Sequence, residues 1–140
     1  MKNIFLDTNI AIDLLSQREP FYSAAVPIFT MGDTGLIRLY ISSLSFSTIF
    51  YLLRKQVGTQ RAMDLLCSFR QMVHIVSVNE KVIDMALQSS FSDFEDAIQY
   101  FSAIESGIPV IITRNVKDFK GVDASVMTPE EFLKTLKKAF

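Results

Sequence analysis

The sequence predicts an α/β domain with a central, mainly parallel sheet of four to five strands and helices on both faces. Short apolar runs typical of buried strands recur along the chain, and segments with the three-to-four residue spacing of amphipathic helices follow most of them. Glycine or proline marks several of the junctions. Strands that alternate with helices in this way form parallel sheets, because each helix returns the chain to the same edge.

One domain, residues 1–140, is expected, because 49% of the residues are apolar and can form a core without disulfides or metal staples. The formal net charge of −1 provides no overall basic field, so nucleic-acid binding would need a local patch. We find neither an export signal nor a membrane-spanning apolar run, and we expect a cytoplasmic protein. The single cysteine, Cys67, lies in an apolar sequence and is expected to be buried and inert.

The first predicted strand ends in an acid. Residues 4–6 are apolar and precede Asp7, Thr8 and Asn9, after which residues 10–15 have helical spacing. Asp7 can cap this helix by accepting hydrogen bonds from its first N–H groups. It can also take part in chemistry, because ligands of open α/β sheets bind outside the carboxyl ends of the strands. This stretch alone leaves both interpretations open.

The remaining segments keep the alternation of strand and helix. The clearest helix start is at Thr128, which is followed by Pro129 and by the capping-box acid Glu131. Three further strands are predicted at residues 39–41, 73–78 and 109–113, with a short fifth candidate at 126–127. Further helices are predicted over residues 21–29, 44–55, 62–72, 79–87 and 93–106, and from 128 onward.

Acidic residues from distant parts of the chain should meet at one edge of the sheet. Asp7 follows the first strand, Asp96 lies at the start of a helix, and Asn115 and Asp118 follow the fourth strand. Carboxylates that lie this close repel one another unless a divalent cation compensates their charge. Oxygen ligands favour Mg²⁺ or Mn²⁺. Such an ion can activate water for attack on a phosphodiester, so the pattern indicates a nuclease.

Three segments resemble the PIN-domain family, which includes the toxin ribonucleases of bacterial toxin–antitoxin pairs. They are residues 5–9 (FLDTN), 94–98 (FEDAI) and 111–119 (IITRNVKDF), and the resemblance extends over nearly the full length of the chain. The resemblance implies a three-layer α/β/α sandwich and RNA cleavage that depends on Mg²⁺ or Mn²⁺. It also implies RNA as the substrate, and it makes an antitoxin protein and a second copy of the chain candidate partners, with no membrane involved.

The resemblance also implies roles for single residues. Asp7 and Asp96 match the first and third acids of the family, and the fourth falls at Asn115 or is supplied by Asp118. We therefore expect Asp7, Asp96 and Asp118 to bind the metal and, together with Asn115, to form the catalytic set. The helix after the second strand usually carries a glutamate in the family, and Thr48 stands at that position here. The residues expected to line the site are Thr8, Asn9, Thr48, Asp93, Glu95 and Thr113.

Several of these residues also have structural interpretations. Residues 92–96 fit two overlapping capping boxes, so Asp93 and Glu95 can serve the helix start instead of a metal. Asp13 lies in or near the first helix and is expected to be solvated. Three cations crowd the loop of the proposed fourth acid and are either phosphate ligands or solvated loop residues: Arg114, Lys117 and Lys120.

The leading hypothesis is a metal-dependent ribonuclease, with a toxin role that rests on family analogy alone. The first alternative is a non-catalytic PIN-fold module that binds RNA or a protein partner, and Thr48 is its main support. A phosphatase with Asp7 as nucleophile is less favoured, because such enzymes carry a second acid two residues later, where this chain has Asn9. A dinucleotide-binding domain is disfavoured because no glycine-rich loop follows the first strand.

Overall fold

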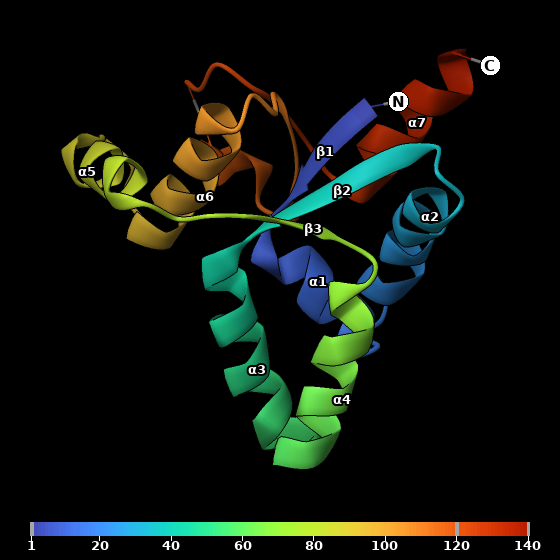
Figure 1. Cartoon of the computed structure of the whole chain (residues 1–140). Coiled ribbons are helices and arrows are strands. Elements are labelled where there is room, and N and C mark those ends of the chain that lie inside the picture. Colours follow the sequence, from blue (N-terminus) through green and yellow to red (C-terminus); the bar gives the residue numbers. More distant parts are fainter. Residues whose placement is uncertain (1, 120, 140) are drawn as a thin grey trace.

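The centre of the molecule is a five-stranded sheet in the order β3-β2-β1-β4-β5. This computed structural model describes residues 2–119 and 121–139, with side chains through residue 136 (Figure 1). Every neighbouring pair of strands is parallel, which confirms the predicted sheet. The strands are β1 (Lys2–Leu6), β2 (Ile37–Ser42), β3 (His74–Val76), β4 (Val110–Ile112) and β5 (Ser125–Met127).

Helices cover both faces of this sheet, so the predicted three-layer α/β/α architecture is confirmed. One face packs against α1, α2, α3, α4 and α7, and the other packs against α6, with α5 lying against α6. Figure 1 shows α3 and α4 running side by side away from the sheet. The helices are α1 (Thr8–Leu15), α2 (Phe21–Asp33), α3 (Ser43–Val57), α4 (Thr59–Arg70), α5 (Glu80–Gln88), α6 (Phe94–Glu105), the short 3₁₀ helix η1 (Val116–Phe119) and α7 (Pro129–Ala139).

The central strand β1 explains how two cores can share one sheet. Side chains of successive strand residues point to opposite faces. Ile4 and Leu6 belong to the core beneath α1–α4 and α7, whereas Phe5 belongs to the core beneath α6. All three side chains are fully buried, as expected for a strand that is covered on both faces. The end of β1, and therefore Asp7, lies at the middle of the sheet edge.

Local sequence signals start the helices largely as predicted. The hydroxyl of Ser42 accepts a hydrogen bond from the Ser45 N–H, so Ser42 is the N-cap of α3. At α7, Thr128 and Glu131 each accept a hydrogen bond from the backbone N–H of the other, which confirms the capping box. These caps fix the points at which α3 and α7 begin, directly after β2 and β5.

Three local predictions are wrong or incomplete. Helix α2 was expected to end before Gly32 but includes it, and a Cβ atom there would lie 2.7 Å from Leu39 Cδ1, so glycine permits the close approach of α2 to β2. Strand β3 is shorter than residues 73–78 because it lies at the edge of the sheet and pairs only with β2. Cys67 is exposed, because α4 turns Ala62 and Phe69 toward the core. Within the described residues, none of the helices has the length and apolar content needed to cross a membrane.

Candidate active site

Asp7 lies where β1 ends and α1 begins, and only 5% of it is exposed. Its backbone N–H donates to the carbonyl oxygen of Ile112 at 2.9 Å, which extends the pairing of β1 with β4. Its Oδ1 accepts a hydrogen bond from the Thr8 N–H at 2.8 Å, so the capping interpretation is confirmed. Its Oδ2 accepts a second bond from the Thr113 hydroxyl at 2.7 Å. The carboxylate is therefore held in one orientation by two neighbouring strand ends.

Residues from four parts of the chain meet around Asp7. A cavity of about 270 Å³ opens at this edge of the sheet, between the starts of α1, α3 and α6 and the loop after β4. We call its five carboxylates, Asp7, Asp93, Glu95, Asp96 and Asp118, the acidic site. All of the predicted site residues that follow line this cavity, and Thr113 reaches it through its bond to Asp7: Asp7, Thr8, Asn9, Thr48, Asp93, Glu95, Asp96, Asn115 and Asp118.

The electrostatics of the acidic site are unfavourable for so many ionised groups. Burial raises the pKa of the Asp96 carboxyl, and the neighbouring carboxylates, Asp7 first, raise it further to about 7. Burial also raises the pKa of Asp7, although the hydrogen bond from Thr113 opposes this shift. The pKa of Glu95 is raised by burial and by the charges of Asp7 and Asp93. The folded protein therefore stabilises a bound proton here, or a cation in its place.

Asp93 combines both of its expected roles. Its Oδ1 accepts a hydrogen bond from the Asp96 N–H at 2.9 Å, so it is the N-cap of α6. It also lines the cavity, and its charge acts on Asp7, Glu95 and Asp96. The cap fixes the first turn of α6, and this turn places Asp96 beside Asp7.

Thr48 lies in the second turn of α3, half-buried, and lines the same cavity as Asp7. The helix starts at the sheet edge, as expected, because its cap Ser42 is the last residue of β2. A hydroxyl at this position can donate or accept a hydrogen bond but adds no charge. The acidic site therefore has no carboxylate on its α3 side.

A buried polar network lies beneath the acidic site. The Gln99 side chain is fully buried, and its Nε2 donates to Thr8 Oγ1 at 3.1 Å and to Ser45 Oγ at 3.2 Å. The hydroxyls of Thr8 and Ser45 lie 2.6 Å apart. These bonds join α6, α1 and α3 one turn below Asp96. Gln99 was not among the residues predicted for the site. Its sequence signal is a polar amide three residues after Asp96 in an otherwise apolar helical segment.

Asp13 is not solvated, in contrast to the prediction. It is 1% exposed, and its Oδ2 accepts a hydrogen bond from Arg114 Nε at 2.7 Å in a salt bridge. The Arg114 guanidinium also lies over the ring of Phe21, 4.2 Å from its centroid. Burial is tolerated because Arg114 compensates the charge of Asp13. The pair ties α1 to the loop that carries Thr113 and Asn115.

The three predicted phosphate-binding cations differ in their surroundings. Arg114 is engaged with Asp13, so its Nε atom is committed to that contact. Lys117 is exposed in η1, next to Asp118 at the rim of the acidic site. Lys120 lies outside the described residues. Of the two described cations in this set, Lys117 is the exposed one, and it directly precedes Asp118 of the acidic site in the chain.

The ligand atoms of the acidic site suit a hard divalent cation, since they are carboxylate and amide oxygens. In the described part of the chain, no three acidic, histidine or cysteine side chains already lie close enough together to hold a metal ion. Glu95 and Asp118 are exposed, however, and can change rotamer without repacking the core. The raised pKa of Asp96 reflects the same excess of negative charge. The side chains thus offer the ligand atoms that a divalent cation prefers, but some of them must change rotamer to surround one.

Comparison with protein families identifies the architecture around this site. The family model of the PIN domain matches residues 3–117 of the chain. The chain belongs to the PIN domain family. The match contains Asp7, Thr48 and Asp96, and it ends one residue before Asp118. The family resemblance inferred from the three sequence segments is therefore confirmed.

Individual relatives of this PIN domain agree with the family assignment. Ribonuclease VapC1 of Aquifex aeolicus (strain VF5) is 25% identical over 136 residues, which cover 94% of this chain and 93% of that protein. A toxin–antitoxin complex from Klebsiella pneumoniae contains a chain with 26% identity and a TM-score of 0.66, with 90% of this chain and 97% of that chain covered. DNA-bound VapBC from Salmonella typhimurium gives a TM-score of 0.72 at 17% identity, with 92% and 99% covered, and supports the fold alone.

Proposed function

We propose that this PIN domain is an endoribonuclease that depends on Mg²⁺ or Mn²⁺. The observation that carries the proposal is the convergence of five carboxylates in one cavity at the carboxyl edge of the sheet. The similarity to a protein named Ribonuclease VapC1 over almost the whole of both chains supports RNA as the substrate. A single domain spanning residues 1–140 is part of the same proposal.

We assign the metal to Asp7 and Asp96, with Asp118 completing the set. Asp7 is oriented for this role because both of its oxygens already accept hydrogen bonds, from Thr8 N–H and Thr113 Oγ1. A bound divalent ion would lower the pKa of water for attack and offset charge on the leaving oxygen. The side-chain amide of Asn115 lines the cavity and can donate to a phosphate oxygen.

Lys117 supplies the positive charge that a phosphodiester needs beside so many acids. It is exposed and adjoins Asp118, so its ammonium group can contact a phosphate at the rim while the carboxylates stay inside. Lys120 is a further candidate for this contact. Arg114 is better assigned to positioning the loop, because its salt bridge with Asp13 holds the backbone that carries Thr113.

The test is cleavage of a mixed RNA pool with and without manganese, followed by sequencing of the new ends. Wild type should cut in manganese and stop in EDTA. Asp7→Asn should reduce the rate by about 100-fold or more, because the variant loses a charged ligand at the centre of the site. Tyr51→Phe, an exposed α3 substitution outside the cavity, is the matched control and should cut normally. Equal cleavage by wild type and Asp7→Asn, insensitive to EDTA, would reject the metal mechanism.

We also propose that the chain is the toxin of a toxin–antitoxin pair, acts in the cytoplasm, and binds an antitoxin protein and a second copy of itself. The solved relative from Klebsiella pneumoniae, which is part of a toxin–antitoxin complex, supports this assignment. Overproduction of wild type should slow growth, whereas Asp7→Asn should not. If both slow growth equally, the toxin role loses its support.

The alternative is a PIN domain that binds RNA or a protein without cutting. Thr48 favours it, because the α3 side of the cavity lacks a carboxylate. A phosphatase with Asp7 as nucleophile is disfavoured, since Asp7 is buried and both of its oxygens are hydrogen-bonded. Calorimetric titration with manganese separates the first alternative from the enzyme, because a non-catalytic module would show no binding that depends on Asp7.

A further inference from the structure

A second and larger cavity, of about 510 Å³, adjoins the acidic site. It lies between the loop at residues 89–92, which joins α5 to α6, and the segment that follows η1. Asp118 lines both cavities, so they are neighbours at the same edge of the molecule. We call this second space the aromatic cavity. Its volume falls within the roughly 300–1,000 Å³ typical of small-ligand sites.

One wall of the aromatic cavity consists of aromatic rings that pack against one another. Phe91 is half-buried, and its ring centroid lies 5.5 Å from that of Tyr100, 6.0 Å from Phe119 and 6.2 Å from Phe101. Tyr100 and Phe119 are buried and belong to the core beneath α6. Phe91 is therefore fixed from behind and can offer a ring to a ligand without rearrangement.

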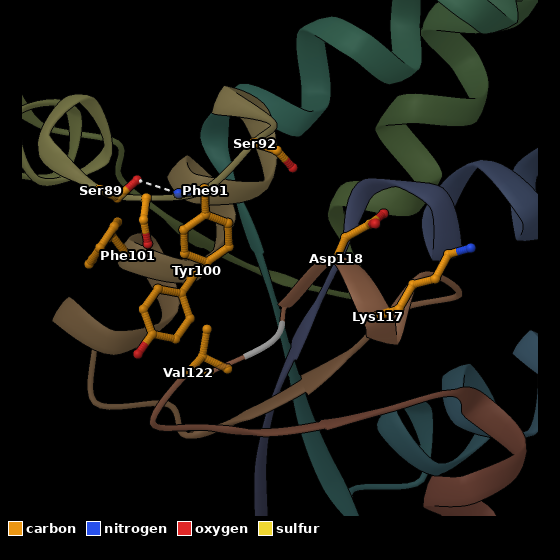
Figure 2. A pocket seen from close by; sticks show the side chains of 10 residues that line it. Ser89, Phe91, Ser92, Tyr100, Phe101, Lys117, Asp118 and Val122 are labelled. Atoms are coloured by element: carbon orange, nitrogen blue, oxygen red, sulfur yellow. Dashed lines mark hydrogen bonds between the residues drawn. The ribbon is translucent and has the colours of Figure 1, made fainter.

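The opposite wall is charged and polar. Figure 2 shows the rings of Phe91 and Tyr100 on one side of the cavity and Asp118 and Lys117 on the other. The loop beside Phe91 adds serine hydroxyls, and the hydroxyl of Ser92 is exposed. A ligand with a flat apolar face, polar edges and a negative charge would meet the rings, the serine hydroxyls and the Lys117 ammonium group. A nucleotide has all three features.

We propose that the aromatic cavity binds one nucleotide of single-stranded RNA, the one adjacent to the phosphate that is cleaved. Its base packs against Phe91, its base edge meets the serine-rich loop, and its phosphate contacts Lys117. This inference rests on the proposed ribonuclease function. Because Asp118 lines both cavities, a chain that enters the aromatic cavity continues directly into the acidic site. Aromatic contacts with bases accept any base, and the hydroxyls add a preference at one position beside the cut.

Fluorescence tests binding directly, because the chain contains no tryptophan. Phe91→Trp in an Asp7→Asn background would place a single reporter in the cavity wall and leave the RNA uncut. A short single-stranded oligoribonucleotide should quench this emission saturably. Tyr51→Trp in the same background is the control, since Tyr51 is exposed on α3 outside the cavity, and its emission should stay constant. Equal quenching of the two reporters would indicate non-specific association and overturn the inference.

Cleavage kinetics supply the second test. Phe91→Ala should raise KM about tenfold while kcat stays within about twofold, as expected when one base contact is lost. Phe91→Tyr should restore KM, and Tyr51→Ala should leave it unchanged. Lys117→Gln should raise KM and flatten its dependence on salt, because one phosphate contact is removed. Sequencing of the new ends should show that Phe91→Ala weakens a base preference on one side of the cut.

The two proposals fail in different ways. If wild type cuts no RNA but an oligoribonucleotide quenches Phe91→Trp alone, the cavity binds nucleotides and the ribonuclease proposal is wrong. If wild type cuts RNA while Phe91→Ala keeps the wild-type KM and Phe91→Trp is not quenched, the ribonuclease proposal stands and the cavity inference is overturned. Thermal melting of each variant identifies loss of folding. If Phe91→Ala does not fold, Phe91→Leu, which keeps an apolar side chain but lacks a ring, replaces it and should raise KM.

Discussion

The main residues of the acidic site are carboxylates that repel one another and that the fold nevertheless brings close together. Asp7 is buried and held by Thr8 and Thr113, and Asp96 is brought beside it by the first turn of α6. The charge on these groups raises the pKa of Asp96 to about 7, after the larger effect of burial. The same imbalance would favour a bound cation, and it should cost stability when no cation is bound.

This imbalance predicts how the metal-free protein responds to pH. Asp96 has a pKa of about 7 in the folded chain against an ordinary value of 3.8, so between these values the folded state binds more protons than the unfolded state. The free energy of unfolding in EDTA should therefore fall as the pH rises from about 4 to 7. Asp7 and Glu95 shift in the same direction.

Urea unfolding at a series of pH values in EDTA measures this dependence. Asp96→Asn removes the titrating group and should flatten the slope. Asp84→Asn, a substitution on α5 away from the acidic site, is the control and should keep the wild-type slope. An identical slope in wild type and Asp96→Asn would show that Asp96 does not titrate as its surroundings indicate.

A glutamate in place of Thr48 should have opposite effects on two properties: it should lower stability without metal and raise the affinity for manganese. Glutamate at this position would add a carboxylate to the cavity that Thr48 lines. Without metal, the added charge repels the existing acids, so Thr48→Glu should lower the melting temperature. With manganese, the added oxygen ligand should tighten binding and leave or increase cleavage. Thr48→Gln, which has similar size and no charge, separates charge from bulk. Unchanged stability and unchanged manganese affinity in Thr48→Glu would place this side chain away from Asp7.

At the residue scale, the convergence of the acids could be predicted from their positions in the chain, whereas their roles remain proposals. Asp7, Asp96, Asn115 and Asp118 follow strands or start helices, and a parallel sheet brings such positions to one edge. The salt bridge between Asp13 and Arg114 was missed. It joins residues about a hundred positions apart in the chain. Their pairing depends on the burial of the α1 side chain Asp13, and local sequence patterns do not predict that burial.

At the scale of elements, the site depends on the loop after β4 being tied to α1. The salt bridge from Arg114 to the buried Asp13 makes this connection, beside the strand end that presents Thr113 to Asp7. Removing one partner of a buried ion pair leaves an uncompensated charge, which costs about 3–5 kcal/mol. Because the side chain of Arg114 is partly exposed, we expect the lower end of that range.

Arg114→Ala should therefore lower the free energy of unfolding by about 3 kcal/mol at pH 7. Adding Asp13→Asn should recover part of the loss, because the buried charge is then gone. Arg38→Ala, an exposed substitution on β2, should cost far less and serves as the control. Denaturant titration measures all four proteins. If Arg114→Ala and Arg38→Ala lose the same small amount, the pair does not stabilise this loop.

The elements themselves were mostly predictable, because apolar periodicity, caps and glycine signals act locally. The exceptions have tertiary causes. Helix α2 continues through Gly32 because it packs closely on Leu39 of β2, and β3 is shortened because it has a single neighbour. Cys67 was misplaced because α4 turns Ala62 and Phe69 into the core, with Leu65 and Leu66 partly buried beside them, and leaves Cys67 on its exposed side.

At the scale of the whole molecule, one parallel sheet explains why residues from position 7 to position 118 share a site. The fold class followed from the alternation of strands and helices, and the convergence of acids followed from the fold class. The aromatic cavity could not be predicted from the fold class. It is lined by the loop at residues 89–92 and by residues after η1, which are brought together by packing between the rings of Phe91 and Phe119. For the whole molecule, we therefore propose that this sheet edge holds a divalent ion beside bound RNA.

The most direct test of that claim is a calorimetric titration of the protein with manganese, with Asp7→Asn and Asp96→Asn measured alongside wild type. Wild type should bind manganese, and each variant should bind at least about tenfold more weakly, because each loses a charged oxygen ligand. Tyr51→Phe should bind as wild type does. Wild-type affinity in both acidic variants, or no binding by wild type at millimolar manganese, would contradict the account.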